Sequence, residues 1–148
     1  MSNEFTEMPK MVLTRSDYVL SALYQWMIEN DGEPQIVVNT LVDGVFAPSN
    51  LINPDGTIVY NLTPTAVSGL SIKDGYVCFN ARFNGKETYV SLPCVSVVVI
   101  FDRVSQIAEQ VNSPEQQQFI IDNGGAKQNE PVAPPPKQEG KSFLRVVK

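Results

Sequence analysis

Apolar residues dominate the stretch from Tyr18 to Ile28, and polar positions recur every fourth residue, at Ser21, Gln25 and Glu29. This spacing predicts a helix with one narrow polar stripe. Thr14 and Asp17 have the spacing of a capping box, with Asp in the place of Glu, so we expect the helix to begin after Thr14 and residues 1–13 to form a frayed leader. The Asn-Asp-Gly sequence at 30–32 predicts its end.

The apolar part of this helix is wider than one core requires. A helix on the surface of a monomer needs an apolar stripe of about 100°, whereas here the apolar residues cover most of the circumference. Either the helix is sunk deeply in its own domain, or it packs on the core with one side and on a second subunit with the other. Both interpretations stay open, because either kind of burial gives the same pattern.

After Pro34 the polar–apolar period changes to two, the period of strands. Short strands are predicted over residues 35–39, 45–47, 57–62, 70–72, 76–83, 86–92 and 95–101, separated by Asp43-Gly44, Asp55-Gly56, Asp74-Gly75 and Asn84-Gly85. Asn84-Gly85 tolerates the two positive φ angles of a type I′ turn and predicts the clearest hairpin. The sequence therefore predicts a mainly β (α+β) fold, in which an antiparallel meander forms a small, partly open barrel with the helix laid against it.

Residues 123–142 have a different character, since seven of the twenty are Pro or Gly and three are apolar. Ordering such a stretch costs about 1–2 kcal/mol per residue with almost nothing to bury, which predicts a flexible tether. The tether leads into Phe143-Leu144-Arg145-Val146-Val147-Lys148, four apolar residues and two cations. This segment is either an extra strand on the body or, as we favour, a short docking peptide for a partner groove.

Composition narrows the possible chemistry. The 148 residues include no histidine, which removes His-based nucleophile pairs, imidazole bases and His metal sites. The Asp-Gly aspartates are explained by turn geometry, and Cys78 and Cys94 by small core positions. We therefore expect no enzyme, no catalytic residue, no metal and no cofactor. Two cysteines, no signal-like opening stretch and no apolar run near the roughly 20 residues of a membrane span predict a cytoplasmic protein without a membrane segment.

Charge is divided unevenly along the chain. Residues 1–122 hold 6 Lys and Arg against 14 Asp and Glu, a net charge of −8, whereas residues 123–148 hold 5 against 2, a net charge of +3. The acidic body argues against nucleic acid as a partner, because nucleic-acid binders carry a clustered basic face. An Sm-like RNA-binding module with a disordered tail is nevertheless the alternative function, and an enzyme that uses carboxylates alone is a third.

Several segments resemble one family in their order along the chain. They are Tyr24-x-Trp26, Val37-Val38, Asp55-Gly56-x-Ile58-Val59-x-Asn61 with Pro64 and Ala66-Val67, Phe79-Asn80-Ala81-Arg82-Phe83-x-Gly85, and Leu144-Arg145-Val146-Val147-Lys148. Together they resemble the stringent starvation protein B family, which supplies adaptors for the ClpXP protease. The resemblance covers residues 16–101 and the last five. The loop Ser49–Pro54 differs, with one additional residue and Leu51 in place of an aromatic, and residues 112–142 lack the family's acidic linker.

The resemblance implies an SH3-like or Sm-like open barrel and a homodimer through the first helix, at Tyr18, Ala22, Tyr24 and Trp26. It implies a domain of residues 1–112 that binds the ssrA tag of incomplete proteins, a linker of residues 113–143, and a docking motif of residues 144–148. That motif, Leu144, Arg145, Val146, Val147 and Lys148, would bind the zinc-binding N-terminal domain of the ClpX unfoldase. The expected function is an adaptor that tethers ssrA-tagged polypeptides to ClpX for degradation by ClpXP.

The tag-binding positions of the family carry over onto Ala66, Val67, Phe79, Ala81, Arg82 and Phe83. Small side chains would admit a peptide backbone, the phenylalanines would form apolar walls, and Arg82 would attract the acidic residues of the tag. Strand alternation, however, places Phe79, Ala81 and Phe83 on one face and Arg82 on the other. Either a bulge or an edge position brings Arg82 to the groove, or part of this set is ordinary core.

Overall fold

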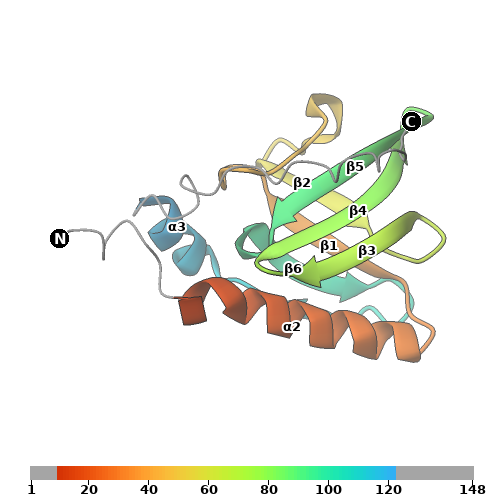
Figure 1. Ribbon diagram of the computed structural model, residues 1–148, viewed down its shortest axis with the longest axis horizontal. Coiled ribbons are helices and arrows are strands. Elements are labelled where there is room, and N and C mark those ends of the chain that lie inside the picture. Colours follow the sequence, from red (N-terminus) through yellow and green to blue (C-terminus); the bar gives the residue numbers. More distant parts are fainter. Residues whose placement is uncertain (1–9, 123–148) are drawn as a thin grey trace.

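The computed structural model describes residues 10–122, and among these it contains two helices and seven strands. A four-stranded antiparallel sheet has the order β2-β1-β6-β7, and a three-stranded antiparallel sheet has the order β3-β4-β5. The elements are α2 (Lys10–Glu29), β1 (Pro34–Asn39), β2 (Thr57–Asn61), β3 (Val67–Lys73), β4 (Tyr76–Phe83), β5 (Lys86–Pro93), β6 (Val97–Asp102), β7 (Ala108–Gln110) and α3 (Pro114–Asp122). Figure 1 shows the long helix α2 along one side of the two sheets. The predicted fold class is confirmed: the protein is mainly β, and its sheets do not close into a barrel.

The predicted start of the first helix is wrong. Thr14 and Asp17 both lie inside α2, which begins at Lys10, directly after Pro9, a residue favoured in a first helical turn. Asp17 is 7% exposed, and its Oδ2 accepts a hydrogen bond of 2.7 Å from the N–H of Gly75, so it holds the helix to the β3–β4 turn. The predicted end is confirmed, since Asp31 has a positive φ of 61° and Gly32 N–H donates to the carbonyl of Met27.

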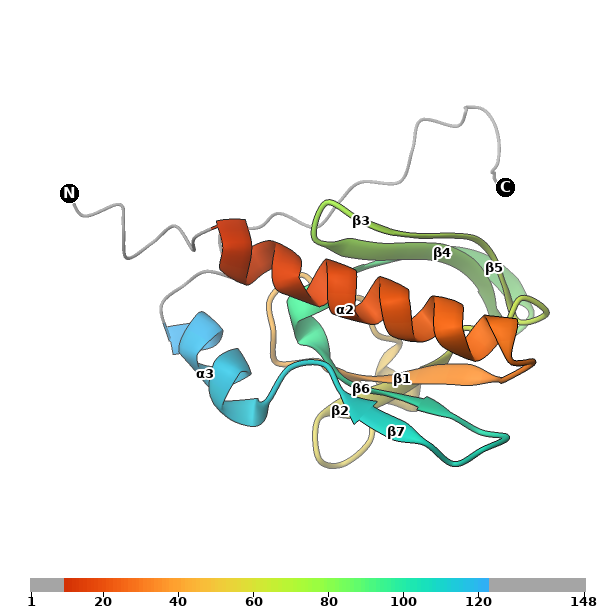
Figure 2. The same cartoon turned by 90° about the horizontal axis from the view of Figure 1, so that it is seen from below.

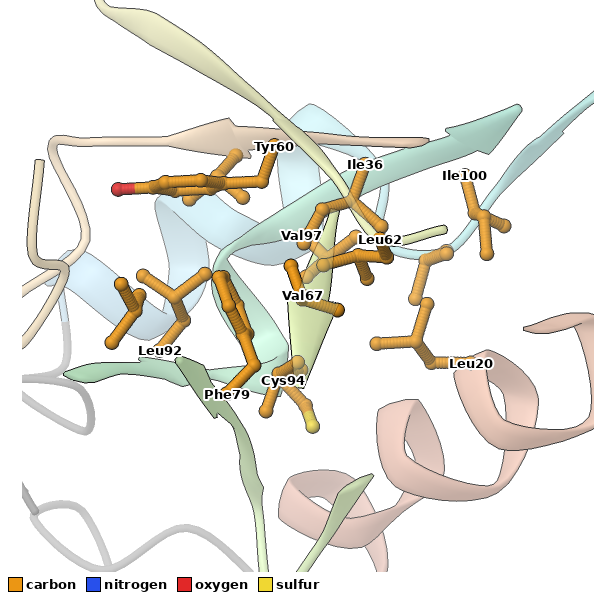
Figure 3. Close-up of a cluster of buried hydrophobic side chains, with 14 of the residues drawn as sticks. Leu20, Ile36, Tyr60, Leu62, Val67, Phe79, Leu92, Cys94, Val97 and Ile100 are labelled. Carbon is orange, nitrogen blue, oxygen red and sulfur yellow. The ribbon is translucent and has the colours of Figure 1, made fainter. Parts of the chain in front are cut away.

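The hydrophobic core fills the space between α2 and the two sheets. Figure 3 shows Leu20 projecting from α2 towards residues of both sheets, among them Ile36, Phe79 and Ile100. All four are 0% exposed. Figure 2 shows how α2 crosses the opening between β3 and the strands β1 and β6. Burial of this apolar surface, at about 25 cal/mol per Å², is the main force that holds the helix to the sheets.

Two turns of the sheet β3-β4-β5 have the geometry that the sequence predicts. Asn84 and Gly85 have φ angles of 55° and 77°, and Asp74 and Gly75 have 55° and 86°. Positive φ at both central positions matches the twist of the flanking strands. Strands β4 and β5 therefore pair without interruption from Tyr76↔Pro93 to Phe83↔Lys86.

The predicted strand over residues 45–47 does not form. This segment lies between Gly44, with a φ of 91°, and Pro48, and the carbonyl of Phe46 accepts a hydrogen bond from Tyr60 Oη instead of a neighbouring strand. The short helix η1 (Ser49–Leu51) follows it. The last predicted strand begins later than expected, at Val97, because Cys94–Ser96 form another short helix, η2, where Ser96 Oγ donates to the carbonyl of Pro93.

Strand β7 and helix α3 lie where no element was predicted, and α3 occupies the first part of the expected linker 113–143. Helix α3 has a capping box, since Ser113 Oγ accepts from the N–H of Gln116 and Gln116 Oε1 accepts from the N–H of Ser113. Gln117, 2% exposed, fixes α3 to the body by accepting from Asn39 and donating to the carbonyl of Val95. The folded part therefore extends to Asp122, nine residues beyond Ser113 and past the predicted boundary at residue 112.

Asn112 is the centre of a buried polar network that joins α2 to the sheets. Its Oδ1 accepts from Ser16 Oγ at 2.9 Å, and its Nδ2 donates to the carbonyls of Cys94 and Val97 at 3.1 and 2.9 Å. Asn112 is 3% exposed and Ser16 is 1% exposed. Because an unpaired buried polar group costs about 1–3 kcal/mol, these bonds fix the position of α2 as well as stabilising it.

Candidate functional site

Four aromatic side chains, which we call the aromatic cluster, lead from the core to the surface: Phe79, Tyr60, Phe83 and Phe46. Phe79 is 0% exposed and Tyr60 3%, whereas Phe83 is partly buried and Phe46 is 40% exposed. Tyr60 contacts Phe79 and Phe83 edge to face, with ring centroids 5.5 and 5.9 Å apart, and Phe83 contacts Phe46 at 6.3 Å. The core thus opens to the surface at Phe83 and Phe46, where an apolar partner has aromatic edges to contact.

Hydrogen bonding holds the surface end of the aromatic cluster in place. Tyr60 Oη donates to the carbonyl of Phe46, which ties the β1–β2 connection to β2. Burial raises the pKa of Tyr60, so its hydroxyl remains a donor across the physiological pH range. The aromatic edge at Phe46 and Phe83 is therefore positioned by the fold before any partner binds.

The end of β4 lies beside this opening. Val77 and Phe79 are buried and Ala81 and Phe83 partly buried, whereas Arg82 on the other face is exposed, so the predicted alternation is confirmed. Pairing with β3 begins at Val67↔Ala81, which leaves the last two residues of β4 beyond the paired part of β3. The bulge of this sheet lies on β3, between Ser68 and Ser71, and β4 has none in its pairing with β5. Of the two arrangements considered for Arg82, the structure thus provides the edge position.

Arg82 lies at this strand end with little to hold it. It stands opposite Glu87 in the β4–β5 register, and its Nη1 donates to the carbonyl of Gly85 at 3.2 Å. Both Arg82 and Glu87 are exposed. Such an arginine keeps most of its donors directed to solvent, and a carboxylate-bearing partner can therefore accept from it.

Not all of the predicted tag-binding residues can contact a partner. Phe79 is fully buried and is a core residue, so its assignment to the groove is wrong, and Val67 is 7% exposed. Ala66 is exposed in the turn before β3, where its N–H donates to the carbonyl of Thr63. The accessible members of the predicted set are Ala66, Ala81, Arg82 and Phe83.

The sequence analysis missed Phe46 and Tyr60. Phe46 stands in a segment that was predicted as a strand, and Tyr60 is one of several apolar residues in β2. The nearby Leu41, Leu51 and Val59 are 72%, 43% and 44% exposed. The excess of apolar residues in the β1–β2 connection was the available signal, because a loop normally carries few of them.

The predicted dimer residues divide into two groups. Tyr18, Ala22 and Trp26 are exposed on one face of α2, with Tyr18 at 76% and Trp26 at 44%. Tyr24 is instead partly buried against the core, and its Oη donates to the carbonyl of Leu62 at 2.9 Å, so it does not belong to the exposed face. Two large aromatic residues at 18 and 26 form an outer face that a monomer has no use for.

The cations and carboxylates of residues 10–122 form neither a basic face nor a metal cluster that we can recognise. Arg103 pairs with Glu33 at 3.0 Å, while Arg15 donates to the carbonyl of Val111 at 2.8 Å. Within these described residues, no group of three His, Cys, Asp or Glu side chains is arranged to hold a metal ion. Neither α2 nor α3 has the length and apolar character needed to cross a membrane. The predicted docking residues 144–148 lie outside the described part of the chain.

Comparison with known proteins adds a family to this geometry. The family model described as stringent starvation protein B matches residues 14–148. A curated relative, the stringent starvation protein B homolog of Haemophilus influenzae, is 34% identical over 86 residues. These residues make up 58% of this chain and 57% of the relative, so the match spans less than two thirds of the relative's length.

Proposed function

This chain belongs to the stringent starvation protein B family, and from that premise we propose that it is a non-enzymatic adaptor that captures ssrA-tagged polypeptides and tethers them to the ClpX unfoldase. Unfolding and peptide hydrolysis then belong to ClpXP. The adaptor acts by holding a substrate near the unfoldase, which raises the local substrate concentration. Such a role needs no catalytic group, cofactor or metal, and it belongs in the cytoplasm.

The observation that carries tag capture is the position of Phe83 and Phe46 beside the unpaired end of β4. An extended peptide laid along this strand end has backbone groups of β4 to pair with, as in other peptides that add a strand to a sheet. Its apolar side chains would contact Phe83 and Phe46, while Ala66 and Ala81 leave room for its backbone. The aromatic rings supply the apolar contact area that dominates binding of this kind.

Arg82 would supply the charge selectivity of the site. The body of the chain is acidic, with a net charge of −8 over residues 1–122, and repels an acidic tag in general. An acidic tag residue on the outer side of the strand end would meet the exposed Arg82 guanidinium, while an apolar residue on the inner side would meet Phe83. Opposite faces of one strand end thus serve one peptide.

Two further parts complete the adaptor. The exposed face of α2, with Tyr18, Ala22 and Trp26, would pair with the same face of a second copy to form a homodimer. The segment 144–148 would dock on the zinc-binding N-terminal domain of ClpX. A dimer then offers two tag sites and two docking segments, which increases the occupancy of the unfoldase without any additional contact.

Titration of a fluorescent ssrA-tag peptide with the intact protein, followed by anisotropy, tests tag capture. We expect saturable binding with two peptides per dimer, and about ten-fold weaker binding for Arg82→Ala, since a charge-assisted hydrogen bond contributes about 1.5–3 kcal/mol. Lys86→Ala, an exposed cation on β5, is the matched control and should leave the affinity within two-fold. Absence of saturable binding would refute tag capture, and equal titrations for Arg82→Ala and the intact protein would remove Arg82 from the site.

A further inference from the structure

A second recessed surface lies away from the aromatic cluster, where α3 meets the N-terminal part of α2. Figures 1 and 2 show α3 at that end of α2. Here the protein forms an open cleft of about 380 Å³, which we call the α2–α3 cleft, lined by Arg15, Asn112, Glu115, Gln116, Phe119 and Ile120. This volume is at the lower end of the roughly 300–1,000 Å³ typical of ligand sites.

The chemistry of the α2–α3 cleft suits an apolar segment with a positive charge. Asn112 has its side chain engaged in three hydrogen bonds, and the Arg15 guanidinium donates to the carbonyl of Val111. The amide oxygen of Gln116 is occupied by the N–H of Ser113. The surface that remains is apolar at Phe119, which is 56% exposed, and acidic at the exposed Glu115.

We propose that the α2–α3 cleft binds the chain's own segment Phe143–Val147. This segment has four apolar residues and Arg145, and residues 123–148 have a net charge of +3 against −8 for residues 1–122. Residues 1–9 also include apolar side chains, but Glu4 and Glu7 make them a poorer match to an acidic body. Charge therefore favours the C-terminal segment over the N-terminal one as the occupant.

The length of the chain makes this contact easy to reach. Phe143 follows Asp122, the last residue of α3, by 21 positions, and a coil of that length has a root-mean-square span of about 25 Å. The cleft residues of α3 lie within about 10 Å of its end along the helix axis, at 1.5 Å per residue. The effective concentration of the segment at the cleft is then in the millimolar range, so even a weak contact would be populated.

The consequence rests on the proposed docking of residues 144–148 on ClpX. A segment held in the α2–α3 cleft is not free to dock, and the apparent dissociation constant for the unfoldase rises in inverse proportion to the free fraction. If half of the segments are held, releasing them doubles the apparent affinity. The contact thus limits docking by adaptors whose segment is still bound to their own body.

The test compares amide resonances of the ¹⁵N-labelled full chain with those of L144D/V146D. We expect differences concentrated at Arg15 and residues 111–120, their loss when both proteins also carry Phe119→Ala, and no change on ten-fold dilution. Val132→Asp is the matched control within residues 123–148. Coincident spectra in this region, differences located elsewhere, dependence on concentration as for a second copy, or a response to Phe5→Asp in place of the C-terminal variants would each overturn the proposal.

A binding measurement with the zinc-binding domain of ClpX separates this inference from the proposed function. Phe119→Ala should bind the domain about two-fold more tightly than the intact chain if half of the segments are held, whereas L144D/V146D should lose binding. If L144D/V146D bound the domain unchanged, the docking proposal would fail while the resonance result still stood. If Phe119→Ala bound no more tightly than the intact chain, regulation by the α2–α3 cleft would be refuted.

Discussion

Phe79 and Phe83 lie two residues apart on the same face of β4, yet their truncation to alanine should affect different properties. Phe79 is fully buried in the core, and removing such a ring costs about 3–5 kcal/mol of unfolding free energy. Phe83 is partly buried and contacts Tyr60 and Phe46. Its removal forfeits part of the roughly 1.5–3 kcal/mol of a buried Phe together with the two ring contacts, so we expect about 2 kcal/mol.

Binding should show the opposite order. Phe83→Ala removes an accessible apolar wall of the proposed tag site, and the loss of about 1.5–2 kcal/mol of binding free energy corresponds to a 10- to 30-fold weaker dissociation constant. Phe79→Ala removes nothing that a peptide contacts, so the folded fraction should bind within about three-fold of the intact protein.

Urea unfolding followed by Trp26 fluorescence, together with tag-peptide anisotropy under native conditions, measures both effects. Phe83→Leu is the matched control, because it keeps an apolar side chain and should retain most of the binding. Val104→Ala, on the exposed β6–β7 turn, should change neither property. Equal losses of stability for Phe79→Ala and Phe83→Ala, or intact tag binding in Phe83→Ala, would refute the graded arrangement of the aromatic cluster.

Three other predictions follow from the described residues. Asn112→Ala should lower the unfolding free energy by about 3 kcal/mol and Ser16→Ala by about 1, with a coupling of about 1 kcal/mol in a double-mutant cycle by urea titration, because both remove the same buried hydrogen bond; additive losses would contradict the network. Hydrogen bonds from the Ser105 side chain and from backbone N–H groups lower the pKa of Asp102 to about 2. The stability from this depressed pKa is complete above about pH 4 and lost as pH falls towards 2, so Asp102→Asn should flatten the decline of unfolding free energy between pH 4 and 2; parallel declines would exclude this role. Ala22→Glu on the exposed face of α2 should convert the dimer to a monomer in sedimentation velocity, whereas Val104→Glu should not; a dimeric Ala22→Glu protein would exclude this face.

Turn chemistry and strand alternation carried most of the fold from sequence to structure. Asn84-Gly85 has both positive φ angles expected of a type I′ turn, and the alternation of β4 correctly separates Phe79 and Phe83 from Arg82. These signals are local, since the turn residues determine φ and the pleat determines the face. The edge position of Arg82 was not predictable in this way, because it depends on where β3 begins to pair.

The errors came from local signals that tertiary contacts override. Asp17 has the spacing of a cap but is used by Gly75, which is 58 positions further along the chain. The true capping box, Ser113 with Gln116, preceded a segment too polar to suggest a helix, and α3 is held by Gln117 and Ile120 against distant residues. Strand β7 is short and exposed along its length, and only its pairing with β6 defines it.

Delivery of a tagged substrate is the measurement that tests the central claim most directly. ClpXP should degrade an ssrA-tagged fluorescent protein, at a concentration well below its KM, faster when this protein is added. Deletion of residues 144–148 should abolish the acceleration while leaving tag-peptide binding unchanged, and this protein without ClpXP should degrade nothing. Unchanged acceleration after the deletion, or no acceleration by the intact chain, would contradict the adaptor account.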